Sequence, residues 1–535
     1  MFFEVRFHLD KNGIRKPYGL FRESFRDGKK VSHRTLGQVA GLPLTTLEAI
    51  RSLLKSGNPK DKEQNDTDSR EHGAVAAVWE VAKRIGLDKI IYSKKESWRE
   101  IIVATIIGRL VYQGSKLSLT NIFCDSSLWE LAGYEALVRP DVDDVYEAMD
   151  RLLERQDHIQ QKLAARHFEN GCVILYDITS SYMEGENCTL AAFGHNRDGK
   201  KGHPQIVIGL LTTKDGCPVG VEVYQGNTAD QSTVMGWVNH LKEKYHLENV
   251  IFVGDRGMLT TARIKEVVAA GFRTVSALTH RRMASLLKQG VFQLGLFDEQ
   301  NIVEVVDPEQ PRVRYMLCRN PIQGVKETET RAKLLVKTEE KLREIASSNK
   351  KRTNEELAAL VGRWLNKWKM AKFFNWEVNE GKLTWIQKDL QIAEDKDLDG
   401  CYVICTDVAV NEMDKESVVA TYRGLMAVDR DFRQMKTVQL EVRPTFHWRE
   451  DRVRAHVFLC TLALYIQWHM KRDLAPLWAT NGAGKKRRWS FPEVLLRLKG
   501  IRRQTSLICG QKCTTMTAPD EEQANILKLL KVSLG

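Results

Sequence analysis

The segment from residue 172 to residue 278 alternates short apolar runs with stretches of helical spacing, and this order constrains the fold more than any other feature. It predicts three strands, a helix, a strand, a helix and a last strand over residues 172–176, 204–213, 218–224, 232–246, 249–253, 260–270 and 272–278. The turn Lys214-Asp215-Gly216 predicts a hairpin between the second and third strands. The chain therefore belongs to the α/β class, with an antiparallel beginning followed by α/β crossovers.

This strand order is that of the ribonuclease H core, in which the first and fourth strands are neighbours. A long segment, residues 279–400, interrupts the order, and its charged stretch 327–369 is typical of a solvated helix pair. A strand at 402–406 restores the pattern, and helices follow at 421–435 and 452–470. We therefore predict a ribonuclease-H-like core with a long insertion before its last functional helix, plus a mainly helical N-terminal region.

Two aspartates follow apolar runs at matching places. Asp177 closes the first predicted strand, and Asp255 lies just past the fourth, in Val253-Gly254-Asp255-Arg256-Gly257. Taken singly, each is typical of a strand exit or a helix cap. Because the two strands are neighbours, both carboxylates are expected at one end of the sheet. The pair favours a divalent-metal site, since Mg²⁺ takes oxygen ligands brought together from separate elements.

A third acid, Asp429, is predicted from helical geometry. At 100° per residue, a helix places it within about 60° of Tyr422, Arg433 and Lys436. The apolar residues Val428, Phe432 and Met435 fall on a neighbouring face, which is expected to pack into the core. A carboxylate beside such side chains suits a metal ligand near a phosphate backbone. The alternative is a surface ion pair between Asp429 and Arg433.

Other acids near these positions are alternatives to Asp429. Asp431 lies 200° from Asp429 around an ideal helix, which excludes it from the face of Tyr422 and Lys436. Three glutamates remain open as acids that approach the same site, namely Glu184, Glu186 and Glu441.

The chain carries 81 Lys and Arg residues against 69 Asp and Glu, a net charge of +12. This balance favours a polyanionic partner, with nucleic acid ahead of an acidic membrane surface. Charged residues stand where a signal peptide needs an apolar core, and the apolar stretch 457–466 is too short to span a bilayer. We expect a cytoplasmic protein, nucleoid-associated when bound to DNA, with no membrane partner. Its ten cysteines indicate ordinary thiols, a zinc site at Cys401/Cys405 or Cys509/Cys513 being the alternative.

The sequence resembles the DDE-class insertion-sequence transposases, specifically the branch with a Y-x2-R-x3-E-x6-K signature on its last catalytic helix. The matching stretch runs from Tyr422 to Lys436, supported by Tyr176-Asp177-Ile178-Thr179-Ser180-Ser181, Gly226-Asn227-Thr228-Ala229-Asp230 and 253–258. The resemblance covers about residues 171–470. The acids are spaced 255 − 177 = 78 and 429 − 255 = 174 residues apart, and the longer interval fits the insertion of this branch.

The resemblance implies a DNA transposase in which Asp177, Asp255 and Asp429 are catalytic and bind Mg²⁺, with Mn²⁺ able to substitute. It implies divalent-metal-dependent cleavage at insertion-sequence ends, followed by strand transfer into target DNA. The implied partners are the terminal inverted repeats, the target DNA and a second copy of the chain in a synaptic homodimer. The DNA-contacting residues would be Tyr422, Arg423, Arg433, Lys436 and Arg256.

Two positions depart from the signature. Leu425 stands where the branch has Arg, with Arg423 nearby as a substitute, and Asp429 replaces Glu, which shortens the side chain by about 1.5 Å. The alternatives are a catalytically decayed relative that binds DNA without cutting it, and a metal-dependent nuclease without strand transfer. A scaffold role for the charged middle helices explains none of the acid spacing.

The predicted domain boundaries follow from these patterns. They comprise a β-hairpin and helix at 1–56, a helical region at 73–168, the core at 171–278 and 401–470, the insertion at 279–400, and a basic C-terminal region at 471–535. The helical region is either a packed bundle or a site that recognises DNA ends. The basic cluster Lys485-Lys486-Arg487-Arg488 falls on a predicted loop.

Overall fold

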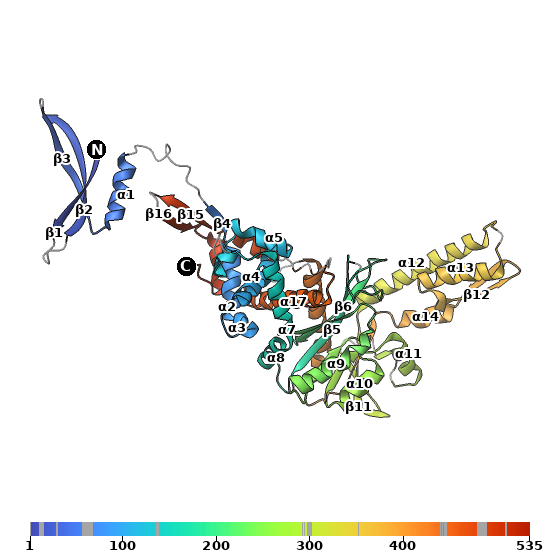
Figure 1. Ribbon diagram of the computed structural model, residues 1–535. Helices are drawn as coiled ribbons and strands as arrows, with labels where there is room; N and C mark the ends of the chain where they lie inside the picture. The colour runs from blue at the N-terminus through green and yellow to red at the C-terminus, as the bar shows by residue number, and fades with distance from the viewer. Residues whose placement is uncertain are drawn as a thin grey trace. The chain divides into compact units, whose positions relative to one another are not determined.

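The computed structural model is drawn in Figure 1. It describes residues 2–534 apart from 10–14, 28–29, 56–67, 135–138, 186, 292, 294, 297–301, 351, 439, 441, 443–446, 479–488 and 509–510. Several positions named above lie outside the described residues, namely Glu186, Glu441, Cys509 and the basic cluster 485–488. The chain divides into two compact units, residues 1–80, 117–139 and 474–535, and residues 81–116 and 140–473. The predicted helical region 73–168 contributes residues to both units.

The first unit begins with a three-stranded antiparallel sheet rather than a simple hairpin. Its strands are β1 (Phe2–Leu9), β2 (Arg15–Asp27) and β3 (Lys30–Ala40), and α1 (Leu44–Lys55) packs against β1 and β2. A second small sheet has the order β16-β15-β4, from Gln511–Met516, Arg502–Ile508 and Asp68–Glu71. This pairing joins segments more than 400 residues apart in the sequence. The helices here are α5 (Lys116–Asn121), α6 (Leu128–Leu131), α18 (Ala475–Trp478), α19 (Phe491–Lys499) and α20 (Glu521–Leu530).

The second unit is built on a mixed sheet with the predicted core order. The core strands are β5 (Val173–Tyr182), β6 (Gln205–Thr213), β7 (Pro218–Gln225), β8 (Ile251–Gly254) and β9 (Arg273–Ala277). β6 pairs antiparallel with β5 and with β7, while β5, β8 and β9 run parallel. The first and fourth core strands are therefore neighbours, which confirms the ribonuclease-H-like fold predicted from the strand order.

The insertion extends this sheet instead of standing wholly apart from it. β14 (Cys401–Thr406) pairs antiparallel with β9, and β11 (Gln310–Arg319) and β10 (Val303–Asp307) continue outward. α11 (His280–Lys288) closes one face of the extension. Its residues Met283 and Leu286 join Leu317 and Val403 in a buried cluster. Burial of this apolar face favours the added strands.

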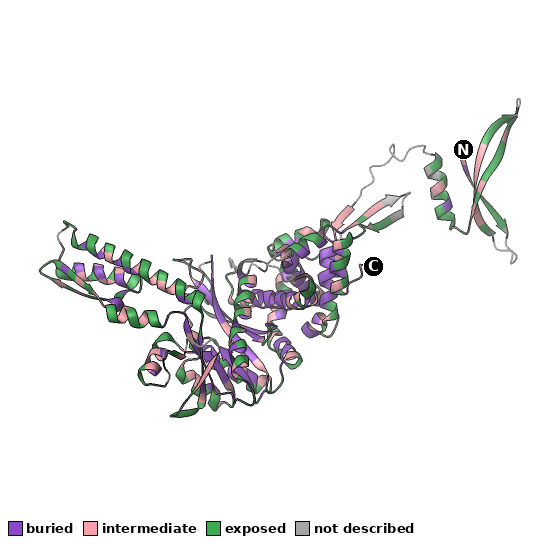
Figure 2. Ribbon diagram, turned by 180° about the vertical axis from the view of Figure 1, so that it is seen from behind, coloured by how far each residue is buried: buried purple, intermediate pink, exposed green. Residues whose placement is uncertain are grey.

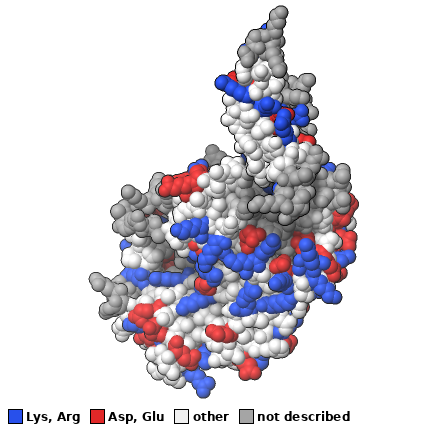
Figure 3. Space-filling model, turned by 90° about the vertical axis from the view of Figure 1, so that its left-hand side faces the viewer, with Lys and Arg blue, Asp and Glu red and all other residues white. Residues whose placement is uncertain are grey.

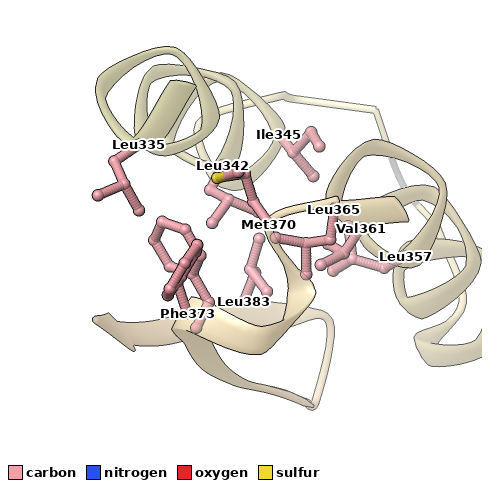
Figure 4. Close-up of a cluster of buried hydrophobic side chains, with 10 residues drawn as sticks. Leu335, Leu342, Ile345, Leu357, Val361, Leu365, Met370, Phe373 and Leu383 are labelled. Atoms are coloured by element: carbon pink, nitrogen blue, oxygen red, sulfur yellow. The ribbon is translucent and has the colours of Figure 1, made fainter. Parts of the chain in front are cut away.

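The rest of the insertion forms a helical arm with its own core. It contains α12 (Pro321–Ala346), α13 (Asn354–Lys367), the hairpin β12 (Phe374–Asn379) and β13 (Lys382–Gln387), and α14 (Asp389–Asp397). Figure 4 shows Leu342, Val361 and Phe373 converging from the two helices and the segment that follows. The predicted helix pair is present. Unlike a fully solvated pair, it packs on the buried apolar cluster of the arm, which we call the seam.

Helices pack on the core sheet and on one another. α8 (Gln156–His167) and α17 (Glu450–Asp473) contact β7, and α10 (Thr261–Ala269) contacts β9. The other helices of this unit are α3 (Leu87–Ile91), α4 (Ser97–Tyr112), α7 (Val142–Glu154) and α9 (Val234–Asn239), and α2 (Gly73–Arg84) is divided between the two units. α17 packs against β7, α4 and α7, and Figure 2 shows the sheet and the helices on it as the buried centre. Among the described residues, no helix combines the length and apolarity that a bilayer crossing requires.

The segment 421–435, predicted as one continuous helix, is divided in the structure. α15 (Lys415–Arg423) ends at Gly424, α16 (Leu425–Arg433) follows, and a π-helical turn covers Gln434–Val438. A Cβ at Gly424 would lie 2.8 Å from the Thr421 carbonyl oxygen and 3.3 Å from Leu175 Cδ1. The glycine therefore allows the break to approach β5 closely.

Candidate active site

Asp177 and Asp255 lie at the same level of two neighbouring strands. The parallel register pairs Tyr176 with Gly254, so the next residue of each segment is an aspartate. β5 continues to Tyr182, which places Asp177 within the strand and not at its end as predicted. The strand lasts longer than its apolar run because β6 still pairs with it beyond the end of β8.

Asp429 reaches the same place from α16, which packs against β5. Together the three aspartates line a cavity of about 990 Å³. Its other lining residues are Ile178, Thr179, Arg197, Asn320, Tyr402, Tyr422, Arg423, Leu425, Met426, Phe432, Arg433 and Lys436. The alternative acid Asp431 is not among them, and Glu184 lies within 4 Å of Lys200 and His203.

The cavity brings three carboxylates together with four basic side chains, Arg197, Arg423, Arg433 and Lys436. Burial, and to a lesser extent the Asp429 and Asp255 carboxylates, raise the pKa of the Asp177 carboxyl to about 7, although the Ile178 amide and Arg197 act to lower it. Burial and the Asp255 carboxylate also raise the pKa of Asp429, although Arg433 and Lys436 oppose this. Clustered carboxylates with raised pKa values are typical of sites that bind a cation.

Among the described residues, one trio of His, Cys, Asp or Glu has ligand atoms all within 4.8 Å of one another, and it does not include the three aspartates of the cavity.

Tyr422 and Arg423 flank the acids from the end of α15. The Tyr422 hydroxyl donates a hydrogen bond of 3.2 Å to Asp255 Oδ1, and burial raises the pKa of this phenol. The Arg423 guanidinium donates to the Tyr402 hydroxyl over 2.7 Å. Arg423 thus reaches the cavity beside Leu425, the position at which the resembled signature has its Arg.

The remaining predicted DNA contacts differ in their surroundings. Arg433 is exposed and lines the cavity. Lys436 also lines it, yet its side chain is buried and its ammonium donates to Thr179 and, over 2.9 Å, to Asp198 Oδ1. Arg256 is exposed next to Asp255 but is not among the cavity-lining residues, and its amide donates to Asp255 Oδ1.

Sequence reasoning missed three lining residues, Arg197, Asn320 and Tyr402. Arg197 forms an ion pair of 2.5 Å with Asp230, which links the loop after β5 to the motif 226–230. A signal existed for Arg197, because the segment Asn196-Arg197-Asp198-Gly199-Lys200-Lys201-Gly202 is basic and glycine-rich. Asn320 and Tyr402 carry no such local signal, since they come from the insertion and its closing strand.

The family described as "Transposase DDE domain" matches residues 169–466. Among solved structures, the cryo-EM structure of a piggyBac transposase synaptic complex with hairpin DNA matches with 8% sequence identity and a TM-score of 0.33. That match covers 80% of this chain and 76% of the other. No curated protein matches the sequence.

Proposed function

We propose that this chain, which belongs to the family of transposases with a DDE domain, cleaves DNA at insertion-sequence ends and joins the freed ends to target DNA. Asp177, Asp255 and Asp429 are the proposed catalytic acids. The observation that carries the proposal is that all three line one cavity, although they come from β5, the segment after β8, and α16.

The donor set fits divalent metal. Three carboxylates supply only oxygen ligands, as Mg²⁺ requires, and Mn²⁺ accepts the same set. The raised pKa values of Asp177 and Asp429 show that mutual repulsion and burial oppose their ionisation, which a bound cation would relieve. Bound there, divalent metal would supply a deprotonated nucleophile and neutralise charge on the leaving oxygen.

The neighbouring side chains are suited to hold the DNA backbone. Arg423 and Arg433 face the cavity as permanently charged donors that match phosphate geometry. Tyr422 restrains Asp255 through its hydroxyl, and Lys436 restrains Thr179 and Asp198. In this proposal Arg423 takes the role of the signature Arg of the Y-R-E-K branch, and Arg256 contacts DNA outside the cavity.

The reaction has two balanced steps. Water adds to the phosphorus at the element end, one P–O bond forms and one breaks, and the leaving strand departs with a 3′-hydroxyl. That hydroxyl then attacks a target phosphodiester, exchanging one P–O bond for another with no further energy source. The protein keeps the attacking and leaving oxygens in line, where small displacements cost large factors in rate. Synapsis of two ends implies a homodimer.

Basic side chains outside the cavity support an extended DNA contact. On the face drawn in Figure 3, Lys and Arg side chains gather across the middle, with Asp and Glu in smaller groups among them. Such a surface supplies the sequence-independent part of DNA binding through phosphate neutralisation. The net charge of +12 agrees with this role.

The test is a cleavage and joining assay with the full chain, Mg²⁺ or Mn²⁺, and a DNA fragment carrying the element ends. Asp177→Asn and Asp255→Asn should abolish nicking while end binding persists, because the amide loses the charge that holds the cation. Asp389→Asn, at an exposed aspartate on α14, is the matched control and should nick normally. Normal nicking by Asp177→Asn would contradict the assignment.

The same assay separates the alternatives. Nicked but never joined products would favour a nuclease. End binding without nicking in either metal would favour a decayed relative.

A further inference from the structure

A second cluster of ligand-type side chains lies in the same unit, away from the acidic cavity. His167, Cys217 and His469 bring their ligand atoms within 4.8 Å of one another. His167 is the last residue of α8, Cys217 directly precedes β7, and His469 lies near the end of α17. We propose that these three side chains form a structural site for a thiophilic divalent cation, with Zn²⁺ as the expected occupant.

The spacing agrees with tetrahedral zinc. Bonds of about 2.3 Å to sulfur and about 2.05 Å to nitrogen, set at a tetrahedral angle, separate the two ligand atoms by about 3.6 Å. The Cys217 Sγ lies 3.9 Å from the His167 Nε2. A shift of about 0.3 Å therefore brings this pair to zinc-binding distance.

An unpartnered buried nitrogen gives independent evidence. His469 is 7% exposed, and its Nε2 atom has no hydrogen-bond partner among the described residues. A buried polar atom without a partner costs free energy, which a metal bond at that nitrogen would offset. Burial and the nearby Arg472 lower the pKa of His469 to about 3, so the imidazole is neutral, as a ligand must be.

The surroundings suit a buried site, in which three protein ligands would leave one of the four tetrahedral positions of zinc to another ligand. Cys217 is 1% exposed, and the rings of Tyr465 and Trp468 pack edge-on against His469 at 4.7 and 4.8 Å. Asp215 and Asp431 act electrostatically on Cys217, which offsets the positive charges of Arg166 and Arg472. Cation binding would release the thiol proton to solvent and leave a metal thiolate.

One interaction competes with the metal. The Tyr465 hydroxyl lies within hydrogen-bond distance, 2.9 Å, of His167 Nε2, the nitrogen that a cation would take. If the cluster were only a hydrogen-bonded packing contact, this hydrogen bond would be the interaction that holds it together. Removing the hydroxyl therefore distinguishes the two roles, because it frees the nitrogen for metal and removes the contact.

Such a cation would tie together three segments of the core unit. α8 leads directly into β5, which carries Asp177, Cys217 stands in the β6–β7 turn, and α17 covers β7. The metal would hold the helices before and after the core to the sheet. Its role is stabilisation of the core, with no part in the reaction.

The experiment measures metal in the purified full chain after exhaustive dialysis, and the absorption spectrum after exchange into Co²⁺. We expect about one equivalent of zinc per chain and a near-ultraviolet thiolate-to-cobalt band, which carboxylate ligands cannot produce. Absence of that band in the wild-type protein would overturn the proposal without recourse to any variant.

Variants then locate the site. Cys217→Ser and His469→Gln should lose the zinc and the band, whereas Cys188→Ser, at another buried thiol, should keep both. Asp177→Asn should also keep both, which separates this site from the proposed catalytic one. Tyr465→Phe should retain the metal. Loss of the metal from Tyr465→Phe, or full retention of the metal by Cys217→Ser, would refute the assignment.

Discussion

The acidic cavity and the helical arm of the insertion are both rich in charge, but they handle it in opposite ways. On the arm, exposed charges pair with partners three or four residues away, as in Glu339 with Arg343 and Lys341 with Glu344. In the cavity, carboxylates from three elements face one another, and the pKa of Asp177 rises to about 7. Local pairs stabilise a helix by small amounts, whereas gathered like charges oppose folding.

The placement of the charged residues, and not their number, distinguishes the cavity from the arm. The arm obtains its stability from a buried apolar seam beneath its charged surface. In the cavity, burial and mutual repulsion of the carboxylates lower stability, and a bound cation would offset this loss. Substitutions in the two regions should therefore differ in kind as well as in size.

The largest expected effect is on catalysis at Asp429. Asp429→Ala should reduce strand cleavage about 10³-fold or more, as is expected for Asp177→Asn, because the site loses a carboxylate that would hold the cation. Asp429→Glu restores the usual length of the family and should retain or raise cleavage if that reach suits the site. The measurement is single-turnover nicking. An active Asp429→Ala beside an inactive Asp431→Ala would show that Asp431, and not Asp429, is the third acid.

In the arm, a core truncation should change stability without changing chemistry. Leu342 is fully buried in the seam, so Leu342→Ala should destabilise the arm by about 2–5 kcal/mol. Val336→Ala, on the same helix but exposed, should have almost no effect. Denaturant unfolding followed by tryptophan fluorescence reports the difference, since Trp364 and Trp368 pack on this cluster. Equal effects from the two substitutions would refute the seam as the source of stability.

A third buried polar cluster makes stability depend on pH. The Lys116 ammonium nitrogen lies 2.9 Å from His456 Nδ1 and 3.3 Å from His447 Nε2. Burial lowers the pKa of Lys116 to about 7, and it also lowers the pKa of both histidines. Between pH 7 and about 10.5 the unfolded state binds the Lys116 proton and the folded state does not. Stability should thus rise with pH there, by up to about 1.4 kcal/mol per pH unit.

The test of this cluster is Lys116→Met, which removes the titrating amine. Its unfolding free energy should rise less steeply between pH 7 and pH 9 than that of the wild-type protein. Parallel curves for the two proteins would show that the lysine is charged in the folded state.

The two cations at the end of α16 should differ in their effect on DNA affinity. Arg433→Ala should lower the slope of log affinity against log salt by about 0.9, the value for one phosphate contact. Lys436→Ala should leave the slope almost unchanged, because its ammonium is already paired with Asp198. Filter binding across a salt series measures both. A larger change for Lys436 would mean that DNA displaces its carboxylate partner.

The smallest expected effect is again on the arm. Arg343→Ala removes an exposed pair with Glu339 on α12 and should cost at most about 0.5 kcal/mol in the free energy of unfolding.

The matching cavity substitution, Asp177→Asn, should raise the melting temperature at pH 8 in the absence of metal, because it removes a repelled charge. A fall in that melting temperature would contradict the electrostatic contrast between the regions.

The sequence by itself determined the core strand order and the segments that supply the acids. Apolar runs, turns and helical spacing are local patterns, and strand adjacency follows from their order by general rules of connection. Hence the neighbouring first and fourth strands were predictable, as was the burial of Val428, Phe432 and Met435. Asp429 was placed beside Tyr422 from an ideal helix, although the real segment breaks at Gly424.

Only the tertiary structure decided which distant side chains meet. The ion pair of Arg197 with Asp230, the capture of Lys436 by Asp198, and the cluster of His167, Cys217 and His469 leave no periodic trace in the sequence. No local sequence pattern likewise predicts the added strands β10 and β11 or the pairing of β4 with β15. These contacts depend on which surfaces become buried against each other, and that free energy belongs to the assembled chain and not to any single segment.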